Sequence, residues 1–346
     1  MTYIEKRKLL QDWLRLDNFT IKDKEFLKEV RPRKGEVHQH FNNLTNLYFS
    51  HLPFGNITID THEISFFEHA TDIINALFDT YVKDDTLVVV SNNEHENVIK
   101  RYKACEHVYE LDFDSEILPC KLDKLFKECS KYQRIFVYVI GTQVSNGIIT
   151  PQLFFTKVRN WLERNEKEYI LNIDDVHGMF IVPRDYSIFD HVIYTCHALI
   201  PDYDAGILIA PLTSQVVGYK FWNWGLEYLQ KLDKILSSYH KFYSFKDVMM
   251  QYFEEEIISG KLTINANTAP HIFGPEVHGF NLDKKTYNDL FKELSEYGLR
   301  FEASFDEKEM CNSRVYLRVR EGQYFMYPER LIPGLEMVKQ VLEMIE

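Results

Sequence analysis

Five polar segments in the middle of the chain carry side chains suited to catalysis or ligand binding, and each follows an apolar run. Asp174, with His177 three residues later, could form an acid/base pair or a metal pair, or Asp174 could cap a helix. Thr71 lies in the first turn of a predicted helix, where free N–H groups suit an anion such as phosphate, although a capping role fits equally well. A single histidine such as His95 after an apolar run is either structural or functional. Because all five segments share this placement, we interpret them as parts of one site. The segments are Phe67–Asn75, Val88–Asn97, Val139–Pro151, Ile173–Gly178 and Tyr194–Pro201.

The apolar runs predict β-strands. From about residue 60 to 210, short β-branched or aromatic runs alternate with amphipathic stretches. Continuous apolar strands separated by helices indicate an α/β fold, with a mostly parallel sheet sandwiched by helices. Ligands of such sheets bind at the carboxyl ends of the strands, where the polar segments begin. The predicted strands are Ile64–Phe67, Leu87–Val90, Ile135–Ile140, Tyr169–Ile173, His191–Tyr194 and Gly206–Ala210.

The chain divides into three predicted parts. Residues 1–44 contain two short amphipathic helices that form an arm or part of a small domain. Residues 45–235 form the large domain, and residues 236–346 form a small α+β domain with helices near Lys231–Glu256, Leu282–Tyr297 and after Pro333. In residues 314–320 of this domain, aliphatic side chains alternate with arginines and a tyrosine, which predicts a strand with one solvent-exposed face.

Composition excludes several classes of protein. The formal net charge of -12 argues against a nucleic-acid partner, because such proteins rely on Lys and Arg contacts to phosphates. The sequence contains no run of about 18 uninterrupted apolar residues, so no membrane-spanning helix is predicted. The five cysteines are scattered, without a CxxC pair, which indicates reduced thiols and a cytoplasmic protein.

In their order and separations, the five segments resemble the cofactor site of class V aminotransferases and cysteine desulfurase-like enzymes. These belong to the fold type I superfamily of pyridoxal 5'-phosphate (PLP) enzymes, and the resemblance covers roughly residues 60–230. Thr71-Asp72-Ile73-Ile74-Asn75 matches the family's Thr-Glu-x-x-Asn segment, which implies that Ala70 and Thr71 hold the phosphate. Glu94-His95 matches a Glu-His pair, which implies that His95 stacks on the pyridine ring. Val144-Ser145-Asn146 resembles a segment that contacts the ring hydroxyl or the substrate through Asn146, although Gly147 comes two residues early.

The remaining motifs concern the ring nitrogen and the cofactor-binding lysine. The resemblance implies that Asp174 pairs with the pyridinium nitrogen, which makes the ring an electron sink, and that His177 lies beneath the ring edge. Asp175 is a less suitable alternative, because it lies only two residues before His177. The family's Ser-x-His-Lys motif reads Thr195-Cys196-His197-Ala198 here. Thr195 and His197 would still bind the phosphate, but Ala198 stands where the Schiff-base lysine belongs.

Near the C-terminus, the family often carries an arginine that binds the substrate carboxylate through its planar guanidinium. Leu317-Arg318-Val319 resembles this element, and Arg314 lies on the same face of the predicted strand. A desulfurase needs a nucleophilic cysteine well upstream of this arginine, and Cys311 is only seven positions before Arg318. Desulfurase activity is therefore disfavoured.

The resemblance implies a PLP-dependent enzyme acting on an amino acid or amine, most simply an aminotransferase, and a homodimer. A lyase or decarboxylase would use the same site. Ala198 either replaces a lysine of the natural protein, which leaves an inactive form, or is native to a non-catalytic binding or regulatory protein. The joint presence of Asp174, His95 and Thr71 favours replacement. A further alternative is an unrelated α/β enzyme with a metal at Asp174 and His177 or at the His38/His40 pair.

Overall fold

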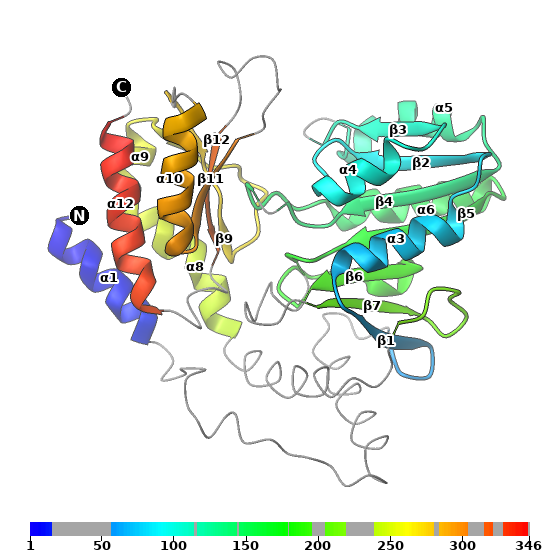
Figure 1. The fold of residues 1–346 in the computed structure, drawn as a ribbon, viewed down its shortest axis with the longest axis horizontal. Helices are drawn as coiled ribbons and strands as arrows, with labels where there is room; N and C mark the ends of the chain where they lie inside the picture. The colour runs from blue at the N-terminus through cyan, green and yellow to red at the C-terminus, as the bar shows by residue number, and fades with distance from the viewer. Residues whose placement is uncertain are drawn as a thin grey trace, which may run out of the picture.

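A seven-stranded sheet forms the centre of the large domain in the computed structural model (Figure 1). The structure describes residues 1–15, 57–113, 116–143, 145–178, 180–195, 205–218, 239–279, 284–303, 315–320 and 328–344. The strand order is β1-β7-β6-β5-β4-β2-β3. The ladders from β3 through β6 are parallel, whereas β7 is antiparallel to both β6 and β1. The strands are β1 (His62–Phe67), β2 (Thr86–Ser91), β3 (Val108–Leu111), β4 (Arg134–Ile140), β5 (Glu168–Asp174), β6 (His191–Thr195) and β7 (Gly206–Pro211).

Helices cover both faces of this sheet. Alternate residues of one strand enter opposite cores: Val88 and Val90 pack with α3 (Ala70–Tyr81) and α4 (Glu96–Tyr102). Val89 lies in the other core, with α5 (Asp123–Cys129) and α6 (Gln152–Arg164). The α/β fold class with a mostly parallel sheet is therefore confirmed, and all six predicted strands are present. Short 3-10 helices lie at Pro119–Lys121, Tyr186–Ile188 and Pro328–Arg330.

The small domain has a second, largely antiparallel sheet of order β11-β12-β10-β8, with β9 paired to β12. Its strands are β8 (Leu262–Thr263), β9 (Ile272–Phe273), β10 (Glu276–Val277), β11 (Leu299–Ala303) and β12 (Val315–Arg320), and its helices are α8 (Tyr239–Tyr252), α9 (Glu254–Ile258), α10 (Lys284–Glu296) and α12 (Leu331–Glu343).

The first helix, α1 (Tyr3–Arg15), packs into this same domain. Its Leu10 and Trp13 are buried in the small-domain core, and the Trp13 ring lies 5.2 Å from that of Phe245, measured between centroids. Figure 1 shows α1 and α12 side by side on the side of the small domain away from the large sheet. The predicted second helix of residues 1–44 and the domain boundaries at 44/45 and 235/236 lie outside the described residues, so the division stays a prediction.

The expectation of an open solvent-exposed face on β12 was wrong at Arg318, which is only 9% exposed. The reason is the position of the sheet, because helices cover one face and the other turns toward the large domain (Figure 1). Tyr316, on the same strand face as Arg318, lines a cavity shared with large-domain residues.

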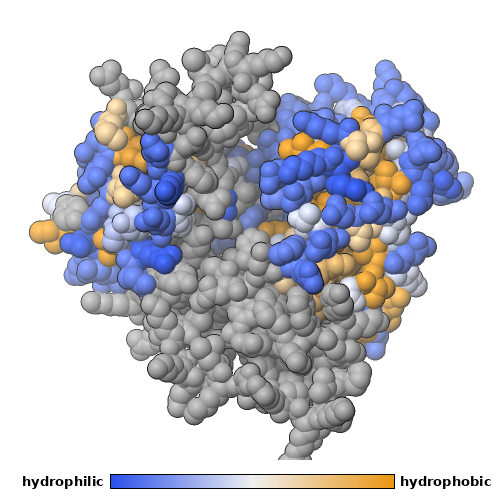
Figure 2. Space-filling view, viewed as in Figure 1, coloured by the Kyte–Doolittle hydropathy of each residue, from blue (hydrophilic) through white to orange (hydrophobic). Residues whose placement is uncertain are grey.

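The described surface in the view of Figure 2 is mostly hydrophilic, with apolar patches on the large domain. Among the described residues, no helix combines the length and apolar character needed to cross a bilayer.

His191, at the start of β6, connects fold stability to acidity. Its Nδ1 lies 2.8 Å from Asn172 Oδ1 and its Nε2 2.9 Å from Ser214 Oγ. Burial lowers the pKa of His191 to about 3. An unfolded chain binds a proton at this histidine below about pH 6.5, whereas the folded chain does not until near pH 3, so stability is lost as pH falls through this window.

We therefore expect the free energy of unfolding to fall by up to about 1.4 kcal/mol per pH unit between pH 6 and 4 because of His191. Urea unfolding at several pH values would measure it. His191→Gln should show a shallower pH dependence, and an unchanged slope in this variant would contradict the assignment.

Candidate functional site

A cavity of about 430 Å³ lies where the carboxyl ends of several large-sheet strands meet the start of α3. Because β1, β2, β4, β5 and β6 run in the same direction, their carboxyl ends share one edge of the sheet. The predicted site residues Ala70, Thr71, His95, Asp174, His177 and Thr195 all line this cavity, together with His69, Ile74, Asn93, Glu94, Ile140, Gln143, Ser145 and Val176. The structure thus brings together residues from all five polar segments.

The start of α3 forms one wall of this cavity, and its position is tightly constrained. A Cβ at Gly206 would lie 2.9 Å from the backbone N and Cα of Ala70, so only glycine lets β7 pass this close to the helix. Asn97 Nδ2 donates a hydrogen bond to Thr71 Oγ1 at 2.7 Å, which ties the first turn of α3 to that of α4. Since the first N–H groups of a helix have no partner within it, this wall can bind an anion.

Asp174 ends β5 with both carboxylate oxygens held by donors. Tyr138 donates its hydroxyl to Asp174 Oδ2 at 2.9 Å, and the Val176 N–H donates to Oδ1 at 3.3 Å. Burial raises the pKa of Asp174, while these two hydrogen bonds and the charge of nearby His95 act in the opposite direction. Asp174 and His95 therefore interact across one cavity.

Asp175 faces a different environment from Asp174. Its side chain is fully buried and pairs with Arg184, with Nε–Oδ2 at 3.1 Å. Tyr186 donates its hydroxyl to the same oxygen at 2.5 Å. Asp175 is not among the residues lining the cavity, so of the two neighbouring acids Asp174 is the one positioned to meet a ligand.

Three polar atoms of residues that line this cavity are buried without a hydrogen-bond partner. They are Thr195 Oγ1, at the end of β6, Gln143 Oε1, in the loop after β4, and Glu94 Oε2, after β2. Buried polar atoms usually have partners, and the two on Thr195 and Gln143 indicate that a ligand completes the site. His197 and Ala198, the next predicted residues after Thr195, lie outside the described residues.

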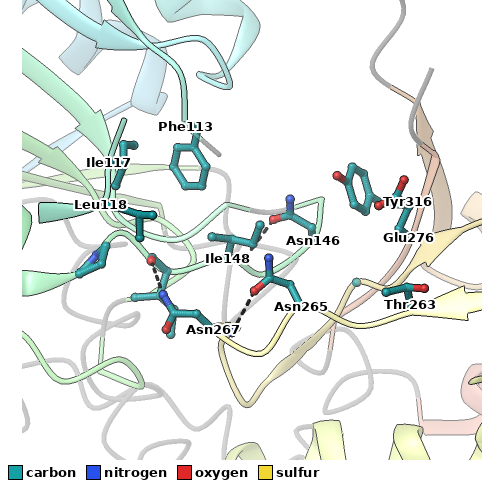
Figure 3. Close-up of a pocket in the computed structure, with 13 residues that line it drawn as sticks. Phe113, Ile117, Leu118, Asn146, Ile148, Thr263, Asn265, Asn267, Glu276 and Tyr316 are labelled. Atoms are coloured by element: carbon teal, nitrogen blue, oxygen red, sulfur yellow. Dashed lines mark hydrogen bonds between the residues drawn. The ribbon is translucent and has the colours of Figure 1, made fainter. Parts of the chain in front are cut away.

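Asn146 lies in another cavity, of about 290 Å³, between the two domains (Figure 3). Its Oδ1 accepts a hydrogen bond from the Ile148 N–H at 3.0 Å, and Gly147 between them has φ +71°, so the chain turns here. Gly274 approaches from the small domain, where a Cβ would lie 2.5 Å from Asn146 Cα. In Figure 3, Asn146 faces Tyr316 and Glu276 of the small domain. Ser145, rather than Asn146, is the residue of this motif that lines the cavity with Asp174.

The predicted substrate-binding arginines are not placed at the Asp174 cavity. Arg318 is buried on β12 and is not among its lining residues, and Arg314 lies outside the described residues. The assignment of either arginine to a substrate carboxylate stays a prediction.

Sequence reasoning missed Glu94, Gln143, Ser145 and Tyr138 as site residues, although each lies within or beside a segment it singled out. The signal for Glu94 was its place beside His95 after a strand. Tyr138 gave no signal, because its contact with Asp174 depends on the pairing of β4 with β5, which places Ile140 opposite Asp174.

A metal site is a weaker interpretation of this geometry. No group of three or more His, Cys, Asp or Glu side chains suited to a metal ion occurs within the described part of the chain. The His38/His40 pair lies outside it.

Comparison with known proteins shows the fold. No protein-family model and no curated protein sequence matches the chain. A NifS-like protein from Rickettsia africae is similar in structure, with 11% identity over 97% of this chain and 96% of that chain, and a TM-score of 0.66. The Sphingomonas wittichii serine palmitoyltransferase has 12% identity over 99% and 84% of the two chains, with a TM-score of 0.61. A PLP-bound C-S lyase from Staphylococcus hominis has 11% identity over 96% and 89%, and also a TM-score of 0.61.

This chain shares their fold. The predicted fold type I architecture, with a large mostly parallel sheet and a small C-terminal α+β domain, is confirmed. At these identities the likeness establishes architecture, and the chemistry must be argued from the residues of the cavity.

Proposed function

We propose that this chain is a PLP-dependent enzyme acting on an amino acid or amine, most simply an aminotransferase, in a form that lacks the cofactor-binding lysine at position 198. The observation that carries the proposal is that Thr71, His95, Asp174 and Thr195 line one cavity. The PLP-bound state of the structurally similar C-S lyase supports the choice of cofactor.

The residues present fit PLP chemically. A phosphate suits the N-terminus of α3, beside the hydroxyl groups of Thr71 and the unpartnered Thr195. Asp174 suits a protonated ring nitrogen, and the imidazole of His95 suits the face of the ring. The cavity of about 430 Å³ lies within the range of about 300–1,000 Å³ that is usual for small-molecule sites.

When bound, PLP supplies an electron-withdrawing ring that stabilises negative charge at the substrate Cα. The part played by this chain is to orient that ring and hold its charge. In this proposal Asp174 keeps the ring nitrogen protonated, and Tyr138 and the Val176 N–H fix the direction of the carboxylate. The start of α3 would hold the phosphate, and Asp174 would meet the ring nitrogen.

A covalent-loading experiment tests this function. We expect Ala198→Lys to form a covalent link with added PLP, seen as visible absorbance and, after borohydride reduction, as one added PLP mass on the peptide that spans position 198. The chain with Ala198 should bind PLP reversibly and carry no such mass. Because the lysine is the only change, the pair isolates the covalent step.

A matched control separates this site from other lysines. Leu212→Lys places an amine on the exposed turn after β7, away from the cavity lining, and should give no specific adduct. Failure of both the parent chain and Ala198→Lys to bind PLP would contradict the proposed function. Reversible binding without an adduct in Ala198→Lys would instead favour the second candidate, a non-catalytic PLP-binding protein, which is motivated by Ala198 itself.

The proposal also includes a homodimer in the cytoplasm, as the sequence resemblance implied. Sedimentation of the purified chain with and without PLP would measure the association state. A monomer under both conditions would contradict this part of the proposal.

A further inference from the structure

Glu94 is a deeply buried carboxyl group that lines the same cavity as Asp174 and has no role in the proposal above. Glu94 is 6% exposed. It lies in the loop that follows β2, directly before His95. The inference drawn from it rests on the proposed function, because it concerns the charge that the cavity presents to PLP.

The two oxygens of Glu94 have unequal surroundings. Oε1 accepts hydrogen bonds from the Ile140 N–H at 2.9 Å, from the Ser91 N–H at 3.3 Å and from the Ser91 hydroxyl. Oε2 is buried and has no hydrogen-bond partner. An ionised carboxylate would leave negative charge on an oxygen that no donor stabilises, whereas a protonated group places its O–H at Oε2 and keeps Oε1 as an acceptor. The donors on Oε1 lower the pKa of Glu94, so the neutral acid is favoured by the burial of the group and by Oε2, where no donor stabilises a negative charge.

Asp174 lines the same cavity and its charge acts on Glu94, so the two acids compete for a proton in different surroundings. Each oxygen of Asp174 accepts a hydrogen bond, and the charge of His95 favours its ionised form. When two carboxyl groups share a site of low dielectric, mutual repulsion keeps one of them protonated. Donors on both oxygens favour charge on Asp174 and the proton on Glu94.

Besides Asp174, and with His95 acting on Asp174, the described groups that interact with Glu94 are neutral. Ser91 of β2 and the Ile140 N–H of β4 are neutral donors, and Tyr138 of β4 and Tyr102 of α4 are phenols that interact electrostatically with Glu94. Burial, with a further contribution from Asp174, raises the pKa of Glu94 to about 8.

We propose that Glu94 is a positioning residue that stays protonated at neutral pH, so that Asp174 is the single negative charge facing the ring of bound PLP. Glu94 acts through Asp174 and does not replace it. Ionisation of Glu94 at higher pH would place a second negative charge beside the ring and change the hydrogen bond between Asp174 and the ring nitrogen.

Infrared spectroscopy of the chain containing ¹³C-labelled glutamate tests the protonation directly, without PLP. We expect a protonated carboxyl band at pH 7 that titrates near pH 8 and is missing in Glu94→Gln. Glu163→Gln is the control, because Glu163 is a surface residue paired with Arg159 and should not contribute to that band. Asp174→Asn should move the Glu94 midpoint to lower pH, because it removes the neighbouring charge. A fully ionised Glu94 at pH 7 would overturn the inference.

The link to PLP needs a second readout. With ¹⁵N-labelled PLP bound, we expect the ring-nitrogen chemical shift of the parent chain to change with the same midpoint as Glu94. Glu94→Gln, which mimics the neutral acid, should bind PLP within about threefold at pH 7 and show no such change. A pH-independent shift in the parent chain would overturn the positioning role. Absence of PLP binding in both chains would instead overturn the proposed function, and the infrared result would still report the state of Glu94.

Discussion

Replacing Arg184 with leucine should lower the free energy of unfolding by about 3–5 kcal/mol, because the change leaves the carboxylate of Asp175 buried without its ionic partner. Both side chains are at most 1% exposed. Arg184 also donates hydrogen bonds to the carbonyl oxygens of Thr150, at 2.8 Å, and Gly141. The pair therefore joins the loop after β4 to the loop after β5. Urea denaturation of the purified variant measures the loss.

Two further variants show whether the buried charge is the cause. Arg159→Leu removes an arginine from the part-exposed pair with Glu163 and should cost no more than about 1 kcal/mol. The double variant Arg184→Leu with Asp175→Asn removes both charges and should recover part of the loss, since no uncompensated carboxylate remains. Equal destabilisation by Arg184→Leu and Arg159→Leu would contradict the argument.

Asp174→Asn should weaken PLP binding roughly 10- to 100-fold, because hydrogen bonds to charged groups contribute about 1.5–3 kcal/mol. Asparagine keeps the shape of the side chain but cannot hold a proton on the ring nitrogen. Equilibrium dialysis at pH 7 gives the affinity, and the ¹⁵N shift of the bound ring reports its protonation. We expect a neutral ring nitrogen in the variant.

Tyr138→Phe provides the comparison for the loss of PLP affinity expected in Asp174→Asn. It removes one hydrogen bond to Asp174 and retains that from the Val176 N–H, so the loss of affinity should be less than tenfold. PLP binding by Asp174→Asn with unchanged affinity and a protonated ring would mean that Asp174 does not face the ring nitrogen.

Much of the large domain could be predicted from the chain because its strands are buried on both faces and form continuous apolar runs. β3 was missed because it lacks this burial. It is a short edge strand that carries Glu110 and is only partly buried, so its sequence does not form a continuous apolar run. Strand order and register are long-range properties, and no local pattern shows that β7 lies between β1 and β6.

The cavity could be predicted in outline because the polar segments follow strands that end at one edge of the sheet. Its finer chemistry could not. The sequence does not show that one oxygen of Glu94 has three donors and the other none, nor that a turn at Gly147 sends Asn146 toward the small domain. Both depend on contacts between segments far apart in the chain.

The small domain contains both the first and the last helix described, with Leu10 and Trp13 of α1 in the same core as Leu335 and Val338 of α12. The chain therefore begins in the small domain, continues through the large domain and returns to the small domain. A pair of fluorophores attached to α1 and α12 would both lie on the small domain and would not detect movement between the domains. A distance sensor for domain closure needs one label on α12 and the other on a large-domain helix such as α6.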